Sequence, residues 1–396
     1  MTINNEHKKL NVPNSTDKGN VIRNVPHLRF PEFQGEWEKK KLEECVDFLD
    51  GLRKPIKSED RKSEKGLYPY YGASGIIDYI DGFIFDGEYI LLSEDGANII
   101  DRNYRVAFIA KGKIWVNNHA HVLQPHNGFD INFLSETLER LNYAVYNTGT
   151  TMPKLNQEVC RNINLKIPAT KEQNKIGNLL SLLNERIATQ NKIIEDLKKL
   201  KSAIIEIEYT PNTKTTSHIG NVIEQISKRN KNNAIQNVLS VSNRQGFIKQ
   251  SDQFENRNVA SEDTSNYKIV EKNDFAFNPA RINVGSIARL TTFEKGIVSP
   301  MYICFRTQEN VAPEYIDFFF ESKHFYYEIQ KRLEGSVRQC LSFEGLCNIP
   351  FSLPSLEMQQ RIGKRLFTLG QKIKTETDLL ELLNKQKQYL LRQMFI

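Results

Sequence analysis

Two histidines separated by one residue are the first side chains of this sequence that could do chemistry. His119 and His121 flank Ala120, and on a strand residues two apart point to the same face, where they could share a metal ion. Protein zinc sites use three or four side chains, and no third ligand clusters with this pair in the sequence. We therefore predict no metal site here.

Two short phrases resemble pieces of catalytic motifs. Asn278-Pro279-Ala280-Arg281 begins like the Asn-Pro-Pro-aromatic signature of amino-group methyltransferases, but it lacks the second proline and the aromatic that would stack on a flipped base. Glu38-Lys39-Lys40 is an isolated Glu-x-Lys of nuclease type. The phosphate loop, the HExxH pair and the GxSxG elbow are all missing from the sequence. These observations predict a chain that is not an enzyme.

Three stretches in each half of the chain carry side chains suited to DNA. Asn and Gln pair with adenine and Arg pairs with guanine in the major groove, while Lys and Arg contact phosphates. The candidates in the first half are Arg53, Lys54, Lys57, Tyr70, Tyr71, Ser74, Asn117, Asn118, His119, Thr150 and Thr151, and those in the second half are Asn243, Arg244, Gln245, Arg281, Asn283, Ser336 and Arg338. Turns also favour Asn and Gly for backbone reasons, so a structural role stays open for each of them.

Charge is distributed unevenly among these stretches. The formal net charge is +6, and residues 353–396 alone carry eight basic and four acidic side chains. Residues 53–65 hold six basic and three acidic groups, whereas residues 78–101 hold seven acidic groups and no basic one. A phosphate-facing surface must use the first stretch and avoid the second, although residues 53–65 could also be a solvated loop.

An internal repeat organises the elements that carry these candidates. Residues 149–209 match residues 335–395 without gaps at an offset of 186 positions, with identities that include Gln173/Gln359 and Gly177/Gly363. The repeat period is about half the chain, which excludes a solenoid of short repeats. The chain is therefore a duplication of two large halves.

Each repeated segment predicts a short strand followed by a long helix. A proline, Pro168 or Pro354, ends the strand, and the helix begins near Lys171 or Glu357. Residues 171–208 contain no proline, so the first helix would be about 57 Å long at 1.5 Å per residue.

Apolar residues recur along both helices at alternating spacings of four and three. The predicted seam consists of Ile176, Leu180, Leu183, Ile187, Ile194 and Leu197 in the first helix and Ile362, Leu366, Leu369, Ile373, Leu380 and Leu383 in the second. Polar residues interrupt it at matched positions, Gln190/Glu376 and Lys201/Lys387, and such breaks can fix the register of two paired helices. An amphipathic helix packed on a globular core is the alternative.

The remaining segments define the domain organisation. Residues 25–167 and 211–352 combine glycine, asparagine, aromatic residues and short alternating runs, which indicate mixed α/β modules, each ending in a short helix near residues 131–146 or 313–333. We predict a polar tail over residues 1–24 and helical segments over residues 168–210 and 353–396. The fold class is α/β (α+β), with two globular modules that each precede a long helix.

Composition limits the cellular setting. Five widely spaced cysteines argue against a disulfide framework and favour a reducing compartment. The first 24 residues lack the apolar core of a signal peptide, and no run approaches the length of a membrane span. We expect a cytoplasmic protein that does not enter a membrane.

Several phrases make the sequence similar to a known family. They are Leu28-Arg29-Phe30-Pro31-Glu32-Phe33-x-Gly35-x-Trp37, Tyr71-Gly72-Ala73-Ser74-Gly75, and Pro168…Glu172-Gln173-x-x-Ile176 with its echo Pro354…Met358-Gln359-x-x-Ile362. Together with the repeat, they resemble the DNA specificity subunit of type I restriction–modification systems over residues 25–396. Met358 departs from the first copy, where Glu172 supplies a charge in the first turn of the helix.

The resemblance implies a mechanism without catalysis by this chain. Residues 25–167 and 211–352 would be target recognition domains that read the two halves of an asymmetric, bipartite site in double-stranded DNA. The two helices would pack as an antiparallel coiled coil and dock two methyltransferase subunits, which bind S-adenosylmethionine and methylate adenine. Restriction subunits, acting as helicase and nuclease, would use ATP and Mg²⁺, so this chain would bind no cofactor. The alternative function is a two-module adaptor on a coiled coil that binds no DNA.

Overall fold

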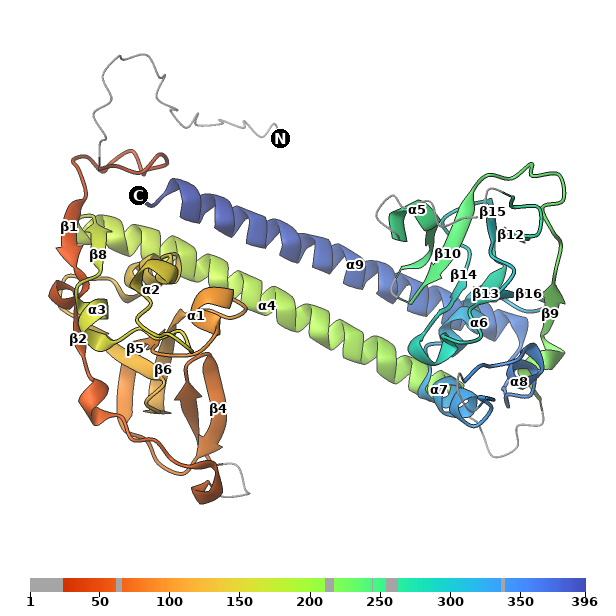
Figure 1. The fold of residues 1–396 in the computed structure, drawn as a ribbon, viewed down its shortest axis with the longest axis horizontal. Coiled ribbons are helices and arrows are strands. Elements are labelled where there is room, and N and C mark those ends of the chain that lie inside the picture. Colours follow the sequence, from red (N-terminus) through yellow and green to blue (C-terminus); the bar gives the residue numbers. More distant parts are fainter. Residues whose placement is uncertain (1–23, 62–65, 211–216, 244, 254–262, 336–338) are drawn as a thin grey trace, which may run out of the picture. The chain divides into compact units, whose positions relative to one another are not determined.

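The computed structural model describes residues 24–61, 66–210, 217–243, 245–253, 263–335 and 339–396. The chain divides into two compact units, each of mixed α/β structure (Figure 1). The first unit contains residues 1–188 and 381–396, and the second contains residues 189–380. In the described ranges, no helix combines the length and the apolar character that crossing a bilayer requires.

A six-stranded sheet forms the module of the first unit. All neighbouring strands are antiparallel except β3 and β6, which run parallel, and a separate pair, β1 with β8, joins the start of the module to its end. The order across the sheet is β2 (Val46–Phe48), β7 (Ala120–Pro125), β5 (Phe85–Ser93), β6 (Ala107–Val116), β3 (Tyr68–Gly72) and β4 (Gly75–Ile80), and the separate pair is β1 (Glu38–Lys41) and β8 (Asn164–Ile167).

Alternation along β5 explains how this sheet is buried on both faces. Ile90 and Leu92 belong to one apolar cluster, with Phe133 and Leu138 of α2 (Ile131–Glu139), whereas Leu91 belongs to a second cluster. Successive residues of a strand point to opposite faces, so a continuous apolar run supplies both clusters. The shorter helical elements of this unit are η1 (Leu42–Glu44), η2 (Asp50–Leu52), η3 (Ser58–Asp60), α1 (Asn98–Asp101), η4 (Tyr143–Tyr146) and α3 (Gln157–Arg161).

Two four-stranded sheets form the module of the second unit. Their orders are β14 (Ile287–Arg289), β13 (Phe275–Phe277), β16 (Ile303–Thr307), β9 (Ile223–Ile226), and β11 (Gly246–Lys249), β10 (Val238–Ser242), β15 (Lys295–Val298), β12 (Lys268–Glu271). Its helical elements are η5 (Ile219–Asn221), α5 (Gln250–Gln253), η6 (Ile282–Val284), α6 (Pro313–Phe319), α7 (Lys323–Gln330) and α8 (Phe343–Cys347).

The two modules share a framework of four antiparallel strands. The first module has the neighbours β2, β7, β5 and β6, and the second has β9, β16, β13 and β14 in the same chain order and pairing. The duplication expected from the sequence is thus present in the strand topology, and the prediction of a mixed α/β fold with two repeated modules is confirmed.

The short helix predicted before each repeat is split into two pieces. In the first unit, the side chain of Asn142 accepts a hydrogen bond from the Ala144 amide and so starts η4 separately from α2. In the second, Ser322 caps α7 and separates it from α6. A capping side chain satisfies the free amides of a new helix, which makes a break in the middle of an apolar pattern stable.

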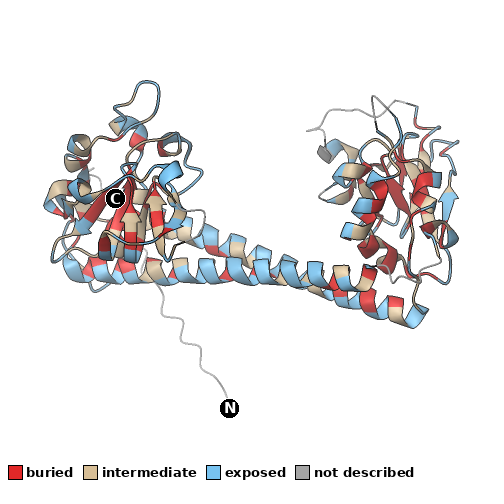
Figure 2. Cartoon of the chain, turned by 90° about the horizontal axis from the view of Figure 1, so that it is seen from below, coloured by how far each residue is buried: buried red, intermediate tan, exposed pale blue. Residues whose placement is uncertain are grey.

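Two long helices, α4 (Thr170–Tyr209) and α9 (Leu356–Gln393), follow the modules. Their buried residues recur at intervals along otherwise exposed surfaces (Figure 2). The first part of α4 and the last part of α9 belong to the first unit, and the remaining parts belong to the second.

Candidate nucleic-acid interface

Separate loops meet at one end of the sheet in the first module. The Asn117 amide donates to the Tyr71 carbonyl oxygen (3.0 Å), and the Ser93 hydroxyl donates to the Ala73 carbonyl oxygen (2.5 Å). These bonds bring the turn that contains Ser74 next to the loop that contains Asn118 and to the end of β5. Two predicted groups of DNA contacts are therefore adjacent in this module.

The third predicted group joins them through the loop of residues 147–155. The Gly96 amide donates to Pro153 O (3.0 Å), and the Leu155 amide donates to Glu94 O (2.7 Å). His119 Nδ1 lies 2.9 Å from the Asp95 carboxylate. The exposed candidates at this end of the module are Ser74, Asn118, His119, Thr150 and Thr151.

Two candidates of the first module are buried, and a third, Arg53, is partly buried and paired within the chain. Tyr70 is 2% exposed and its hydroxyl accepts a hydrogen bond from the Ile56 amide, and Asn117 is 5% exposed and accepts one from the His119 amide. Arg53 donates to Glu94 Oε2 (2.7 Å) and to Ala120 O (2.8 Å). Since these groups are buried or already paired, we revise their predicted role from DNA contact to support of the loops.

The other candidates of the first module lie at or near its surface. Lys54 is exposed, and its carbonyl oxygen accepts a hydrogen bond from Trp115 Nε1 (2.6 Å). Lys57 is exposed and lies 3.9 Å from Glu59, and Tyr71 is partly buried. Of these, the two lysines remain available to contact phosphates.

The second module brings its candidates together in the same way. The Cβ that an alanine would have at residue 285 lies 3.7 Å from the Asn243 Cβ, so the β10–β11 turn adjoins η6. The Leu341 amide donates to Pro279 O (3.0 Å), so the segment that follows residue 338 lies beside the turn that precedes η6. Asn243, Gln245 and Arg281 are exposed and Asn283 is partly buried, whereas the predicted residues Arg244, Ser336 and Arg338 lie outside the described residues.

The Asn-Pro-Ala-Arg phrase lies in this second group and forms a turn. Asn278 is buried, and its side-chain oxygen accepts a hydrogen bond from the Ala280 amide (3.1 Å). An Asn that closes its own turn is using its side chain to stabilise the backbone. The phrase therefore places Arg281 at the surface and holds it there.

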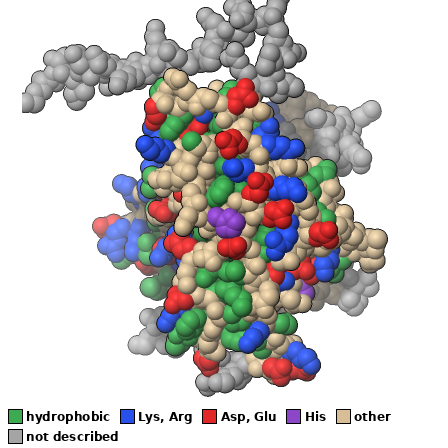
Figure 3. Space-filling model, turned by 90° about the vertical axis from the view of Figure 1, so that its left-hand side faces the viewer, with side chains coloured by type: hydrophobic (Ala, Val, Ile, Leu, Met, Phe, Trp, Pro, Cys, Tyr) green, Lys and Arg blue, Asp and Glu red, His purple; other side chains and the backbone are tan. Residues whose placement is uncertain are grey.

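Basic side chains are mixed with acidic ones on one face of the first unit (Figure 3). On the face drawn in Figure 3, acidic and basic side chains are interspersed among apolar and neutral ones. The predicted basic stretch is partly neutralised within the chain, because Arg61 pairs with Asp78 (3.2 Å) and Arg53 pairs with Glu94. Net charge is therefore a weak guide to where DNA would bind.

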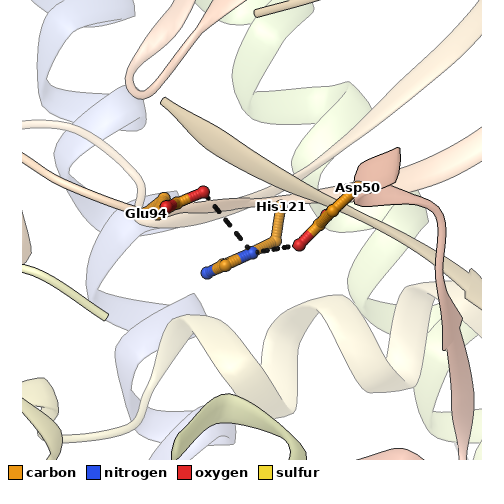
Figure 4. Close-up of side chains that lie close together, drawn as sticks. All are labelled: Asp50, Glu94 and His121. Atoms are coloured by element: carbon orange, nitrogen blue, oxygen red, sulfur yellow. Dashed lines mark hydrogen bonds and ion pairs between the residues drawn. The ribbon is translucent and has the colours of Figure 1, made fainter. Parts of the chain in front are cut away.

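A buried ionic cluster lies beneath the loops of the first module. His121, 1% exposed, has its Nδ1 atom 2.6 Å from Asp50 and 3.8 Å from Glu94 (Figure 4), and its Nε2 atom 2.8 Å from the Leu155 carbonyl oxygen. Burial alone would lower the pKa of His121, but the hydrogen bond to Asp50 and the neighbouring Cys160 raise it to about 10. The imidazole is therefore a buried cation at neutral pH.

No local spacing in the sequence points to this cluster. The sequence predicted that His119 and His121 could share a face, but the structure joins His121 to Asp50 and Glu94, and joins His119 to Asp95. The ligand-type atoms of Asp50, Glu94 and His121 lie within 4.8 Å of one another. Partners separated by up to 71 residues cannot be found from local spacing.

Gln173 and Gly177, which are identical in the two repeats, dock the start of α4 on the first module. Gln173 Oε1 accepts a hydrogen bond from the Asp130 amide (3.1 Å), and Gln173 Nε2 donates to Pro168 O (2.9 Å). A Cβ at Gly177 would lie 2.0 Å from Asp130 Oδ1, the atom that caps α2. Only glycine allows the helix to approach so closely.

The second unit repeats this docking with α9. Gln359 Oε1 accepts a hydrogen bond from the Ala312 amide (2.9 Å), and Gln359 Nε2 donates to Pro354 O (2.9 Å). A Cβ at Gly363 would lie 3.0 Å from the Glu314 Cβ, so the approach is close but less tight. The repeat identities found in the sequence thus mark one joint that is built twice.

Within each unit, the end of one long helix also packs on the module. In the first unit Phe395 stacks on Phe133 (5.3 Å between ring centroids), and Lys387 lies 3.3 Å from Glu136. In the second unit the repeat equivalents of Phe395 and Lys387 are Tyr209 and Lys201. Tyr209 packs on Tyr315 (4.8 Å), and Lys201 lies 2.6 Å from Glu321.

The long helices run antiparallel where they meet within the second unit. Gln190 Nε2 donates to Glu376 O (3.0 Å) and to the Glu376 side chain, and Glu208 pairs with Arg365 (3.9 Å). Residues later in α4 thus meet residues earlier in α9. All twelve predicted seam residues are buried or partly buried, including Ile187, Leu197, Leu369, Ile373 and Leu380.

Comparison with known proteins decides the family. A family model described as the type I restriction modification DNA specificity domain matches twice, at residues 34–199 and 205–385. The chain belongs to this specificity family. The specificity subunits of the family are non-catalytic, in agreement with the sequence prediction that the chain is not an enzyme.

Individual relatives agree with this assignment. The specificity subunit of the type I restriction enzyme MjaVIII from Methanocaldococcus jannaschii is 24% identical and covers 92% of this chain and 90% of the relative. A putative type I specificity subunit from Haemophilus influenzae is 36% identical, but the match spans only 37% of either chain. The crystal structure of the type I S subunit from M. genitalium has the same fold, with a TM-score of 0.66, 16% identity, and coverage of 94% of this chain and 99% of that one.

Glu172, in the first turn of α4, anchors the helix in the first copy of the repeat. Glu172 is buried and forms a two-pronged ion pair with Arg29, at 2.8 and 2.7 Å. In the second copy Met358 packs against the apolar core instead. The departure seen in the sequence therefore exchanges an ionic anchor for an apolar contact.

Proposed function

We propose that this chain reads a bipartite site in double-stranded DNA, one half with each module, and directs partner subunits to it. The observation that carries the proposal is the repeated framework. In both modules the exposed polar candidates converge on adjoining loops, while the strands and the helix joint beneath them are shared. Two copies of one scaffold with different loops are suited to reading two different half-sites.

The loops that carry the exposed candidates, here called the reading loops, hold side chains that can form hydrogen bonds with DNA bases. Asn118, Thr150 and Thr151 in the first module, and Asn243, Gln245 and Arg281 in the second, are exposed and hold hydrogen-bonding side chains. Each good pair between such a side chain and a base edge discriminates by about 1–3 kcal/mol. A few such pairs in each module would suffice for a specific site.

The long helices would serve as the spacer between half-sites and as the platform for partners. α4 contains 40 residues, which corresponds to about 60 Å of helix. We expect two methyltransferase subunits on this platform, carrying S-adenosylmethionine and methylating adenine, and restriction subunits that use ATP and Mg²⁺. This chain itself would hold no cofactor and would work in the cytoplasm.

A paired insertion tests the spacer directly. Four residues added after Lys192, together with four added after its repeat equivalent Asp378, lengthen both helices by about 6 Å while keeping their partners matched. Sequencing of methylated DNA should then show the same half-sites with a longer gap. An altered half-site sequence would contradict the spacer role.

A non-DNA-binding adaptor is the alternative function, and salt dependence separates the two. A protein that neutralises phosphates loses affinity steeply as salt rises, because bound counterions are released. The purified chain with its methyltransferase partner should bind duplex DNA with such a dependence. Absence of any salt-sensitive DNA binding would favour the adaptor.

A further inference from the structure

The buried ionic cluster of the first module connects the elements that carry its exposed candidates. Asp50 lies in η2, His121 lies in β7, and Glu94 follows β5. Leu155 ends the loop that contains Thr150 and Thr151, and its carbonyl oxygen is bound by His121 Nε2 at 2.8 Å. One imidazole therefore ties a strand and a turn to a reading loop.

The hydrogen bonds define the state of this imidazole. Asp50 Oδ2 faces Nδ1 and the Leu155 carbonyl oxygen faces Nε2, and both of these partners are acceptors. Both ring nitrogens must then donate, so His121 carries a proton on each nitrogen. The two carboxylates of Asp50 and Glu94 balance this charge in the interior.

Other groups around the cluster complete the pairing. Arg53 Nη1 donates to Glu94 (2.7 Å), and Lys154 lies 3.5 Å from the same carboxylate. Asp50 also accepts hydrogen bonds from Gln157 Nε2 (3.1 Å) and the Val122 amide (3.0 Å). Since donors already hold both carboxylates and the Cys160 thiol adjoins the ring, the arrangement is a satisfied ion network and not a metal site.

The network reaches the reading loops within one or two residues. Lys154 and Leu155 end the loop of residues 147–155. The Glu94 amide donates a hydrogen bond to the His119 carbonyl oxygen (2.9 Å). Asp95, next to Glu94, holds the His119 ring. A change at His121 would therefore move the loop with Thr150 and Thr151 relative to His119.

We propose that His121 is a positioning residue that sets how the first module discriminates bases in its half-site. This proposal rests on the proposed function, since it assigns a role within DNA reading. His121 does not touch DNA, because it is buried, and it acts through Leu155 and Glu94 on the loops above it.

Among the described residues, the strand of the second module that corresponds to β7 carries no buried imidazole. β16 occupies the place of β7 in the shared framework, and its inward residues include Cys304 and Phe305 in apolar clusters. The second module has its own buried cation in a different place, since Arg289 of β14 pairs with Glu314 (2.6 Å) and Asp317 (3.1 Å). The effect of His121 should therefore be confined to one half-site.

A substitution in the full chain, assembled with its methyltransferase partner, tests this role. His121→Leu keeps much of the volume and removes both donors. We expect discrimination between the correct half-site and its single-base variants to fall about tenfold or more in the half read by the first module, and to stay unchanged in the other half. His126→Gln is the matched control, since His126 follows the same strand directly and lies partly exposed beside Asp47 (3.1 Å).

A milder variant and a spectroscopic measurement guard against a folding defect. If His121→Leu does not assemble, Glu94→Gln removes one charge of the network and should give the same half-site effect at a smaller size. In the unmodified protein, ¹⁵N shifts of the ring should show both nitrogens protonated near neutral pH. A neutral ring, or assembled variants that discriminate normally at both half-sites, would overturn the proposal. Failure of the unmodified complex to methylate any bipartite site would instead remove the proposed function.

Discussion

The two modules have the same framework and fill it with different chemistry. β2, β7, β5 and β6 of the first correspond to β9, β16, β13 and β14 of the second, and a repeated Gln and Gly form the joint to a long helix in each. The first module supports its loops with a buried His–carboxylate network, whereas the second packs apolar side chains at the corresponding strand. A scaffold can thus be retained while the side chains at a corresponding strand change from an ionic to an apolar contact.

The joint itself also differs between the units in how tightly it is closed. Gly177 approaches Asp130 more closely than Gly363 approaches Glu314, and only the first joint carries the Arg29–Glu172 ion pair. These differences predict unequal responses to matched substitutions, which can break or sharpen the comparison.

The largest effect is expected at the aromatic contact that closes the first unit. Phe395 is buried against Phe133 and Trp37, so Phe395→Ala should destabilise the first unit by about 3–5 kcal/mol through loss of burial and a remaining cavity. Chemical unfolding followed by tryptophan fluorescence measures this loss, since both tryptophans, Trp37 and Trp115, lie in the first unit. The control is Tyr104→Ala, at an exposed position of the same unit, which should change stability little; equal losses would contradict the packing.

A smaller but more discriminating effect is expected at the repeated glycines. Gly177→Ala should cost about 1–3 kcal/mol, because its Cβ would displace the carboxylate that caps α2. Gly363→Ala should change stability by less than about 1 kcal/mol, since the gain in helix propensity offsets a contact that can adjust. Thermal unfolding of the two variants compares them directly. The reverse order would show that the two joints are not related as described.

The charge on His121 should make the stability of the first unit depend on pH. The pKa of His121 is raised to about 10, so its contribution to stability is complete below its ordinary pKa and is lost as pH rises toward 10. Between these values the first unit should lose on the order of 1 kcal/mol per pH unit relative to a His121→Leu variant. Urea unfolding at several pH values measures the difference between the two proteins. A difference that is independent of pH would mean that His121 is neutral in the folded protein.

Sequence alone predicted the duplication and the two long helices because their signals are local or repeated, whereas the shared order of four strands was found only in the structure. The offset of 186 identified Gln173, Gln359, Gly177 and Gly363, and the spacing of four and three identified the buried positions of both long helices. The family resemblance rested on the repeat and on the phrases at residues 28–37 and 71–75, and the family model matches both halves.

The candidate site was predicted only in part, because its decisive contacts join distant residues. Ser74, Asn118 and Thr150 lie at the surface of adjoining loops, but Arg53 and Tyr70 turned inward. Arg53 meets Glu94, which is 41 residues away, so composition made residues 53–65 look more available to phosphates than they are. Ion pairs of this kind can be assigned only once the strand order is known.

Exchange of one module tests most directly whether each module reads its own half-site. The segment of residues 217–352 would be replaced with the second module of another specificity subunit, leaving residues 24–210 and 353–396 unchanged, and methylated sites would be mapped by sequencing. The account predicts that one half-site changes while the other half-site and the gap are retained. A pattern that changes in both halves, or in neither, would contradict a reader built from two independent modules.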